Sequence, residues 1–120
     1  MTRIVTAILF FSLGFLSFNS STSVVRVELK NISNEDFKKV YVNICGQKFE
    51  FENLKKDESK NLKVEKSYRY CYMRVITSID TLICQPIDFV GEKLYTSGKL
   101  VMPITIITND QNRSLIIQLK

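Results

Sequence analysis

Apolar and polar residues alternate along most of the chain after residue 23, and this pattern most constrains the fold. It is clearest in Val25–Leu29, Val40–Phe51, Leu100–Ile106 and Leu115–Leu119. A period of two is typical of half-buried strands, and no segment after residue 23 sustains the 3.6-residue period of a helix. Seven or eight such segments, with turn signals about every ten residues, predict a single all-β sandwich.

The segment Tyr68–Ile76 is predicted to be a strand inside this sandwich. It is rich in aromatic and β-branched residues, which favour strands. Tyr68, Tyr70 and Tyr72 share one face, and neither face is fully polar, as expected of a strand inside a sheet. The residues of the other face are Arg69, Cys71, Met73 and Val75.

An immunoglobulin-like antiparallel arrangement is the default expectation for a sandwich of this size. The chain has no tryptophan, so the Cys…Trp…Cys pattern of antibody domains is missing. The sequence therefore predicts the sandwich architecture without the true antibody topology.

Two hairpins are predicted from the alternation. In the first, Gly46-Gln47 forms a two-residue turn that sets Ile44 opposite Phe49 and Val42 opposite Phe51. In the second, the loop is Asn109–Asn112, and the expected pairs are Ile106 with Leu115, Ile104 with Ile117, and Met102 with Leu119. Pro86 and Pro103 each predict an edge position for their strand, because proline cannot donate to a ladder.

Residues 1–23 are predicted to be a signal peptide, and residues 24–120 the β-sandwich domain. Ile4–Phe18 is apolar, short for a membrane span and of the right length for a signal sequence, and Ser21 and Ser23 precede a possible cut before Val24. The predicted location is secreted or periplasmic. The alternative is an uncleaved anchor that holds the domain on the outer side of a membrane, with membrane contact only through residues 1–23.

Three cysteines in a chain predicted to be exported favour one disulfide and one free thiol. We expect the Cys71–Cys84 bridge, although the two pairings with Cys45 stay open because sequence does not determine connectivity. The chain has no histidine, so a catalytic cysteine would lack its usual partner. No cysteine or histidine spacing indicates a metal site, and no cofactor is expected.

The tyrosines are the candidate binding residues. Tyr68, Tyr70, Tyr72 and Tyr95, with Tyr41, are predicted either to form an aromatic surface for a partner or to pack across strands. Recognition is also expected at the edge strands that carry Pro86 or Pro103, by strand addition. The loops Asn53–Asn61 and Gly91–Gly98 are further candidates.

The charges favour no nucleic-acid-binding function, and the missing histidine argues against an enzyme. The net charge is +5, but basic and acidic residues are interleaved, and no basic stripe or nucleic-acid motif is present. The sequence predicts a non-enzymatic binding or accessory domain whose partner is an unknown protein or envelope component. A histidine-free hydrolase built on Ser59, Ser67 or Cys45 is the remote alternative.

Overall fold

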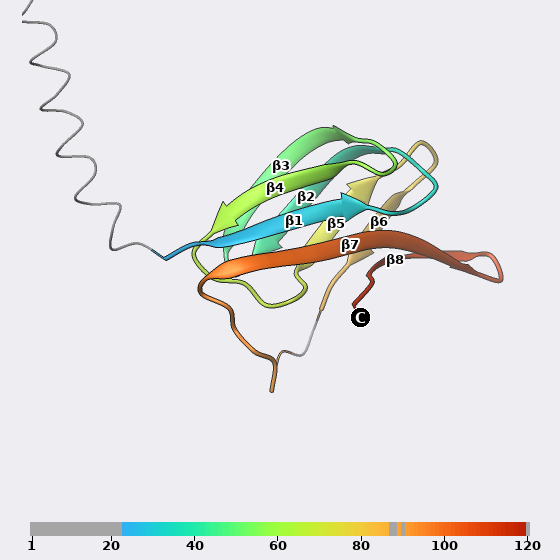
Figure 1. The fold of residues 1–120 in the computed structure, drawn as a ribbon. Helices are drawn as coiled ribbons and strands as arrows, with labels where there is room; N and C mark the ends of the chain where they lie inside the picture. The colour runs from blue at the N-terminus through green and yellow to red at the C-terminus, as the bar shows by residue number, and fades with distance from the viewer. Residues whose placement is uncertain (1–22, 87–88, 90, 120) are drawn as a thin grey trace, which may run out of the picture.

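The computed structural model describes residues 23–86, 89 and 91–119, and these residues form eight β-strands joined by turns and loops (Figure 1). The predicted signal peptide lies outside the described residues, except for Ser23. No helix of the described part is long and apolar enough to span a bilayer. The strands are β1 (Val25–Asn31), β2 (Phe37–Ile44), β3 (Gln47–Leu54), β4 (Ser59–Val64), β5 (Tyr72–Ile76), β6 (Thr81–Cys84), β7 (Gly98–Asn109) and β8 (Asn112–Ile117).

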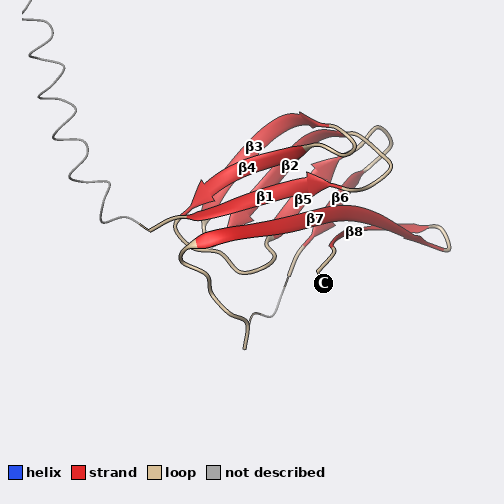
Figure 2. Ribbon diagram, in the orientation of Figure 1, coloured by secondary structure: helices blue, strands red, loops and turns tan. Residues whose placement is uncertain are grey.

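The strands form two four-stranded sheets that pack face to face, which confirms the predicted β-sandwich (Figure 2). One sheet has the order β4-β1-β7-β8 and the other β3-β2-β5-β6. Neighbouring strands are antiparallel except β1 and β7, which run parallel. As the missing antibody pattern predicts, the strand order is not that of immunoglobulin constant domains, where the first strand pairs with the second.

The core consists of the inward-facing residues of both sheets, as the alternation requires. In β1, the burial alternates along the strand, and Val25, Val27 and Leu29 are fully buried. Phe37, at the start of β2, is the largest fully buried side chain. The other buried apolar residues are Val40, Val42, Ile44, Leu54, Leu62, Val64, Cys71, Met73, Val75, Leu82, Met102, Ile104 and Leu115.

Strand β5 lies between β2 and β6, which confirms that the tyrosine-rich segment contributes an inner strand. It is shorter than predicted, because it begins at Tyr72. Cys71, Met73 and Val75 are buried, and Tyr72 faces outward. The face assignment from the sequence is therefore correct within the strand.

The β2–β3 turn differs from its prediction by one residue. The two turn residues are Cys45 and Gly46, with φ of 49° and 93°, so Val42 pairs with Phe49. Positive φ at both positions is typical of a type I′ turn, which matches the twist of a hairpin. The Asn43 side chain accepts the Gly46 N–H at 2.9 Å. Each residue keeps its predicted face because the register changes by two positions.

The β7–β8 hairpin has the predicted register at its closed end. Ile106 pairs with Leu115 and Ile104 with Ile117, whereas the expected pair of Met102 with Leu119 is absent because β8 ends at Ile117.

The edge position expected for Pro103 is wrong, because β7 lies between β1 and β8. The Pro103 carbonyl accepts the Gln118 N–H at 2.8 Å. The nitrogen and carbonyl of one strand residue point to the same side, so the missing N–H faces position 118, just beyond the last residue of β8. The proline therefore removes only the bond that its N–H would donate to the Gln118 carbonyl, and every bond within β8 is kept. The strand before Pro86 is β6, which is an edge strand as predicted.

The charged loop predicted at Asn53–Asn61 is mostly strand. β3 continues to Leu54 and β4 begins at Ser59, so the connection is limited to four residues. The polar start of β4 pairs with β1 through Ser59, Lys60 and Asn61. β4 is an edge strand, where charged and polar residues are tolerated and discourage aggregation.

Replacing Leu29 by alanine is expected to lower the free energy of unfolding by about 2–5 kcal/mol, because the side chain is fully buried and leaves a cavity. Urea denaturation followed by circular dichroism measures the change. Leu94→Ala is the matched control: Leu94 is 41% exposed, and its truncation should change stability by less than about 0.5 kcal/mol. Equal losses in the two variants would contradict the core described here.

Candidate functional site

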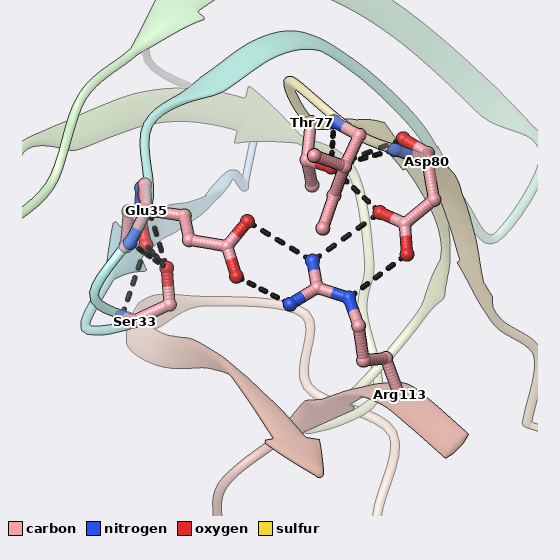
Figure 3. A network of polar contacts seen from close by, with 7 residues as sticks. Ser33, Glu35, Thr77, Asp80 and Arg113 are labelled. Atoms are coloured by element: carbon pink, nitrogen blue, oxygen red, sulfur yellow. Dashed lines mark hydrogen bonds and ion pairs between the residues drawn. The ribbon is translucent and has the colours of Figure 1, made fainter. Parts of the chain in front are cut away.

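Arg113, at the start of β8, links two carboxylates from separate turns (Figure 3). Its guanidinium donates to Glu35 at 2.6 and 3.0 Å and to Asp80 at 2.8 and 3.2 Å. Glu35 lies between β1 and β2, and Asp80 lies between β5 and β6. The arginine therefore joins three connections at one end of the sandwich, and we call this group the Arg113 clasp.

Asn31, at the end of β1, adds buried hydrogen bonds at the same end of the sandwich. Its buried amide donates to the carbonyls of Glu35 and Leu54, and its oxygen accepts from the Ser33 backbone and hydroxyl. A fully satisfied buried polar group of this kind specifies one loop arrangement. The side chains of Asn31 and of the Arg113 clasp form their hydrogen bonds within the molecule. We therefore assign this end of the sandwich a structural role.

The outer face of the β3-β2-β5-β6 sheet offers a different arrangement. Residues of β2, β3 and β5, most of them with outward-facing side chains, surround a hollow of about 490 Å³. We call this hollow the tyrosine–arginine groove. Its lining residues are Tyr41, Val42, Asn43, Lys48, Phe49, Glu50, Tyr72 and Arg74.

Cross-strand pairing places the polar groups of this groove. Tyr41 of β2 is directly opposite Arg74 of β5 and Glu50 of β3. The Arg74 guanidinium carbon lies 4.1 Å from the centroid of the Tyr41 ring, a cation–π contact that holds the side chain over the sheet. Lys39 pairs with Glu50 at 2.9 Å, and this carboxylate raises the pKa of Lys39.

A second hollow of about 210 Å³ adjoins the groove, because Asn43 and Tyr72 line both. The Phe89 ring stacks on Tyr68 and Tyr70 there, with centroids 4.4 and 5.2 Å apart. The remaining lining residues are Cys45, Gly46, Cys71 and Pro86. The two hollows are therefore adjacent, and the second lies beside the β2–β3 turn.

The structure brings together three of the four tyrosines predicted as a binding surface. Tyr72 belongs to both hollows, and Tyr68 and Tyr70 to the second. Tyr95 lines neither hollow; its backbone pairs with Ser67, and Lys93 lies over its ring.

Arg74, Asn43 and Lys48 were missed as site residues by sequence reasoning. Their alternation with buried residues indicates an outward face, but which strands are neighbours is not visible in the sequence.

The predicted Cys71–Cys84 bridge is not formed, and all three cysteines are free. The register explains this: Cys84 is opposite Met73, which makes Cys71 its diagonal neighbour. Diagonal Cα atoms lie about 7–8 Å apart, beyond the usual span of a disulfide. Cys71 instead contacts the Met102 sulfur at 3.8 Å in the core, and burial raises the pKa of its thiol to about 12.

The residues named for a hydrolase are not assembled into one site. The Ser67 hydroxyl is buried and donates to the Tyr68 carbonyl, whereas the Ser59 hydroxyl of β4 donates to Glu28 of the neighbouring strand β1. Cys45 lies in the second hollow, whose described lining contains neither a carboxylate nor a lysine.

Comparisons with known proteins agree with the fold. No family model matches the chain, and no curated protein is similar to it in sequence. One solved structure, described as an NMR structure of a protein from Eubacterium rectale, has a TM-score of 0.59 and 11% identity. The match covers 82% of this chain and 91% of that one. At this identity the similarity shows a shared fold and carries no information about function.

The Arg113 clasp predicts a pH-dependent contribution to stability. Arg113, followed by Thr77, holds the pKa of Asp80 below its usual range. A lowered folded pKa stabilises the fold above the unfolded value of about 3.9, and this contribution is lost as pH falls through the folded pKa. Asp80→Asn is therefore expected to lower the urea midpoint at pH 7, and the difference from wild type should vanish at strongly acidic pH.

The matched control for this prediction is Asp110→Asn. Asp110 is exposed in the β7–β8 turn with φ of 58°, a conformation that asparagine also adopts. A wild-type midpoint for Asp80→Asn at pH 7, or a difference that persists at acidic pH, would contradict the assigned role of Asp80.

Thiol labelling should follow burial. With N-ethylmaleimide at pH 8, we expect rapid modification of exposed Cys45, slower modification of half-buried Cys84 and none of Cys71. Peptide mass spectrometry identifies the modified sites, and labelling in urea should reach all three. Labelling of Cys71 in the folded protein at the rate of Cys45 would refute the buried position described for it.

Proposed function

We propose that this chain is a small exported β-sandwich that acts as a non-enzymatic binding domain, with the tyrosine–arginine groove as its contact surface. The observation that carries the proposal is the concave outer face on which Tyr41, Tyr72 and Arg74 lie together. Tyrosine and arginine are enriched among the residues that dominate protein interfaces. The partner is a protein or another envelope component.

The packed strands that carry the groove favour binding with little rearrangement of its side chains. Its lining residues lie on β2, β3 and β5, and the inward neighbours Val40, Met73 and Val75 are fully buried. Side chains held on packed strands lose less conformational entropy on binding than side chains on loops. The groove is therefore a preformed surface.

Export is supported by the signal-like residues 1–23 together with the position of the first strand. β1 begins at Val25, so a cut before Val24 would remove no residue of any strand. Retention of residues 1–23 as an anchor is the alternative, and it would leave the groove and its proposed role unchanged.

The test is site-specific photo-cross-linking in the organism that encodes the chain. The full-length gene carries p-benzoylphenylalanine at position 72 in one strain and at position 101 in another. Val101 is 48% exposed on the outer face of the other sheet, so it reports nonspecific contact. We expect a discrete cross-linked product from position 72, recovered outside the cytoplasm, and none from position 101.

Two measurements make this test decisive. The N-terminus of the recovered product, read by mass spectrometry, should be near Val24; a full-length chain in the membrane fraction would favour the anchored alternative. Products of equal yield from both positions, or none from position 72, would argue against the groove as the contact surface.

A further inference from the structure

We infer that the tyrosine–arginine groove recognises an acidic peptide segment, with a carboxylate of that segment bound by Arg74. This inference rests on the proposed binding function and specifies the chemistry of the partner. It is carried by a charge imbalance in the groove: Arg74 and Lys48 have no carboxylate partner among the described residues, whereas the one acid of the lining, Glu50, is already paired with Lys39.

Arg74 is the central donor. Its guanidinium stacks on Tyr41, yet no carboxylate of the described residues lies within ion-pair distance of it. Stacking uses the face of the guanidinium and leaves the N–H groups at its edge available. This differs from Arg113, whose donors are already used by Glu35 and Asp80.

The neighbouring polar groups have the same character. The Asn43 side-chain oxygen accepts the Gly46 N–H, so its amide nitrogen remains as a donor. Lys48 has no carboxylate partner among the described residues. The one acid of the groove, Glu50, is paired with Lys39. The groove therefore has an excess of positive charge. This charge favours an anionic ligand with hydrogen-bond acceptors.

A carboxylate fits this arrangement in geometry as well as in charge. The two oxygens of a carboxylate match the parallel N–H groups of a guanidinium, and this bidentate pairing is stronger than a neutral hydrogen bond. The cation–π contact with Tyr41 limits the conformations of the Arg74 side chain, so less side-chain entropy remains to be lost on binding.

The aromatic rings favour a peptide over an acidic sugar. Binding of sugars uses open ring faces, but Arg74 covers a face of Tyr41, and Tyr68 and Tyr70 are stacked on Phe89. Of the two apolar lining residues, Val42 is buried in the core, so the partly exposed Phe49 is the one that can contact an aliphatic side chain beside the acid. We therefore assign the groove to a glutamate- or aspartate-containing peptide.

The experiment is an NMR titration of the ¹⁵N-labelled full-length protein in detergent. The probes are a blocked pentapeptide library with a fixed central glutamate, the same library with central glutamine, and tetragalacturonate. We expect the glutamate library, at millimolar concentration, to shift the Arg74 side-chain signal and the amides of Tyr41, Asn43 and Tyr72. The glutamine library should cause no shift.

Three variants locate the effect. Arg74→Gln should weaken binding of the glutamate library about ten- to a hundredfold, the range for loss of a hydrogen bond to a charged group. Arg74→Lys keeps the charge but lacks the planar fork, and should also weaken binding. Arg26→Gln is the matched control, because it removes the same charge from an exposed position on β1, and it should bind as wild type does.

The inference is overturned if the glutamate library leaves the Arg74 signal unmoved, if the glutamine library binds equally well, or if Arg74→Gln retains wild-type affinity. Tighter binding of tetragalacturonate than of the peptides would assign the groove to acidic glycans instead. Cross-linking from position 72 that survives in Arg74→Gln would leave the binding function intact while removing acid recognition, so the two proposals fail separately.

Discussion

The parallel pairing of β1 with β7 is the constraint on which the rest of the structure depends. Parallel strands cannot be joined by a tight turn, so the chain between them must make a long crossover. Here the crossover contains β4 and the complete β3-β2-β5-β6 sheet, and that sheet covers the inner face of β1 (Figure 1). Burial of the inward residues of β1 therefore depends on both its own sheet and the sheet packed against it.

The same topology makes the two ends of the sandwich chemically different. The β1–β2, β3–β4, β5–β6 and β7–β8 connections all lie at one end, where Arg113 and Asn31 join them through internal hydrogen bonds. The β2–β3 turn lies at the opposite end, beside the hollow that contains Tyr68, Tyr70 and Phe89. Polar groups are satisfied within the molecule at the first end, whereas the groove near the second keeps donors for another molecule.

The alternation of apolar and polar residues was sufficient to predict much of the fold, but it was insufficient to predict the candidate site. Alternation predicted the strands, the inner position of β5 and the closed end of the β7–β8 hairpin, because these features depend on neighbours in sequence. The turn at Cys45 was missed because a positive φ at a non-glycine residue is uncommon. The contact of Arg74 with Tyr41, and the diagonal offset of Cys71 from Cys84, depend on which strands pair and in what register. That information arises from nonlocal packing, so the tyrosines could be proposed from the sequence but their cationic partner could not.

The position of residue 23 has a geometric consequence for any tether attached through it. The first residue of β1 lies at the end of the sandwich that carries the β2–β3 turn, because β1 runs away from that end and β2 returns to it. A surface holding the chain through its N-terminal side would lie nearest the hairpin turn, with the Arg113 clasp directed away from it. The groove lies on the outer face of the β3-β2-β5-β6 sheet, between the two ends of the sandwich. It would therefore face sideways, parallel to such a surface, and remain open to ligands that diffuse along that surface.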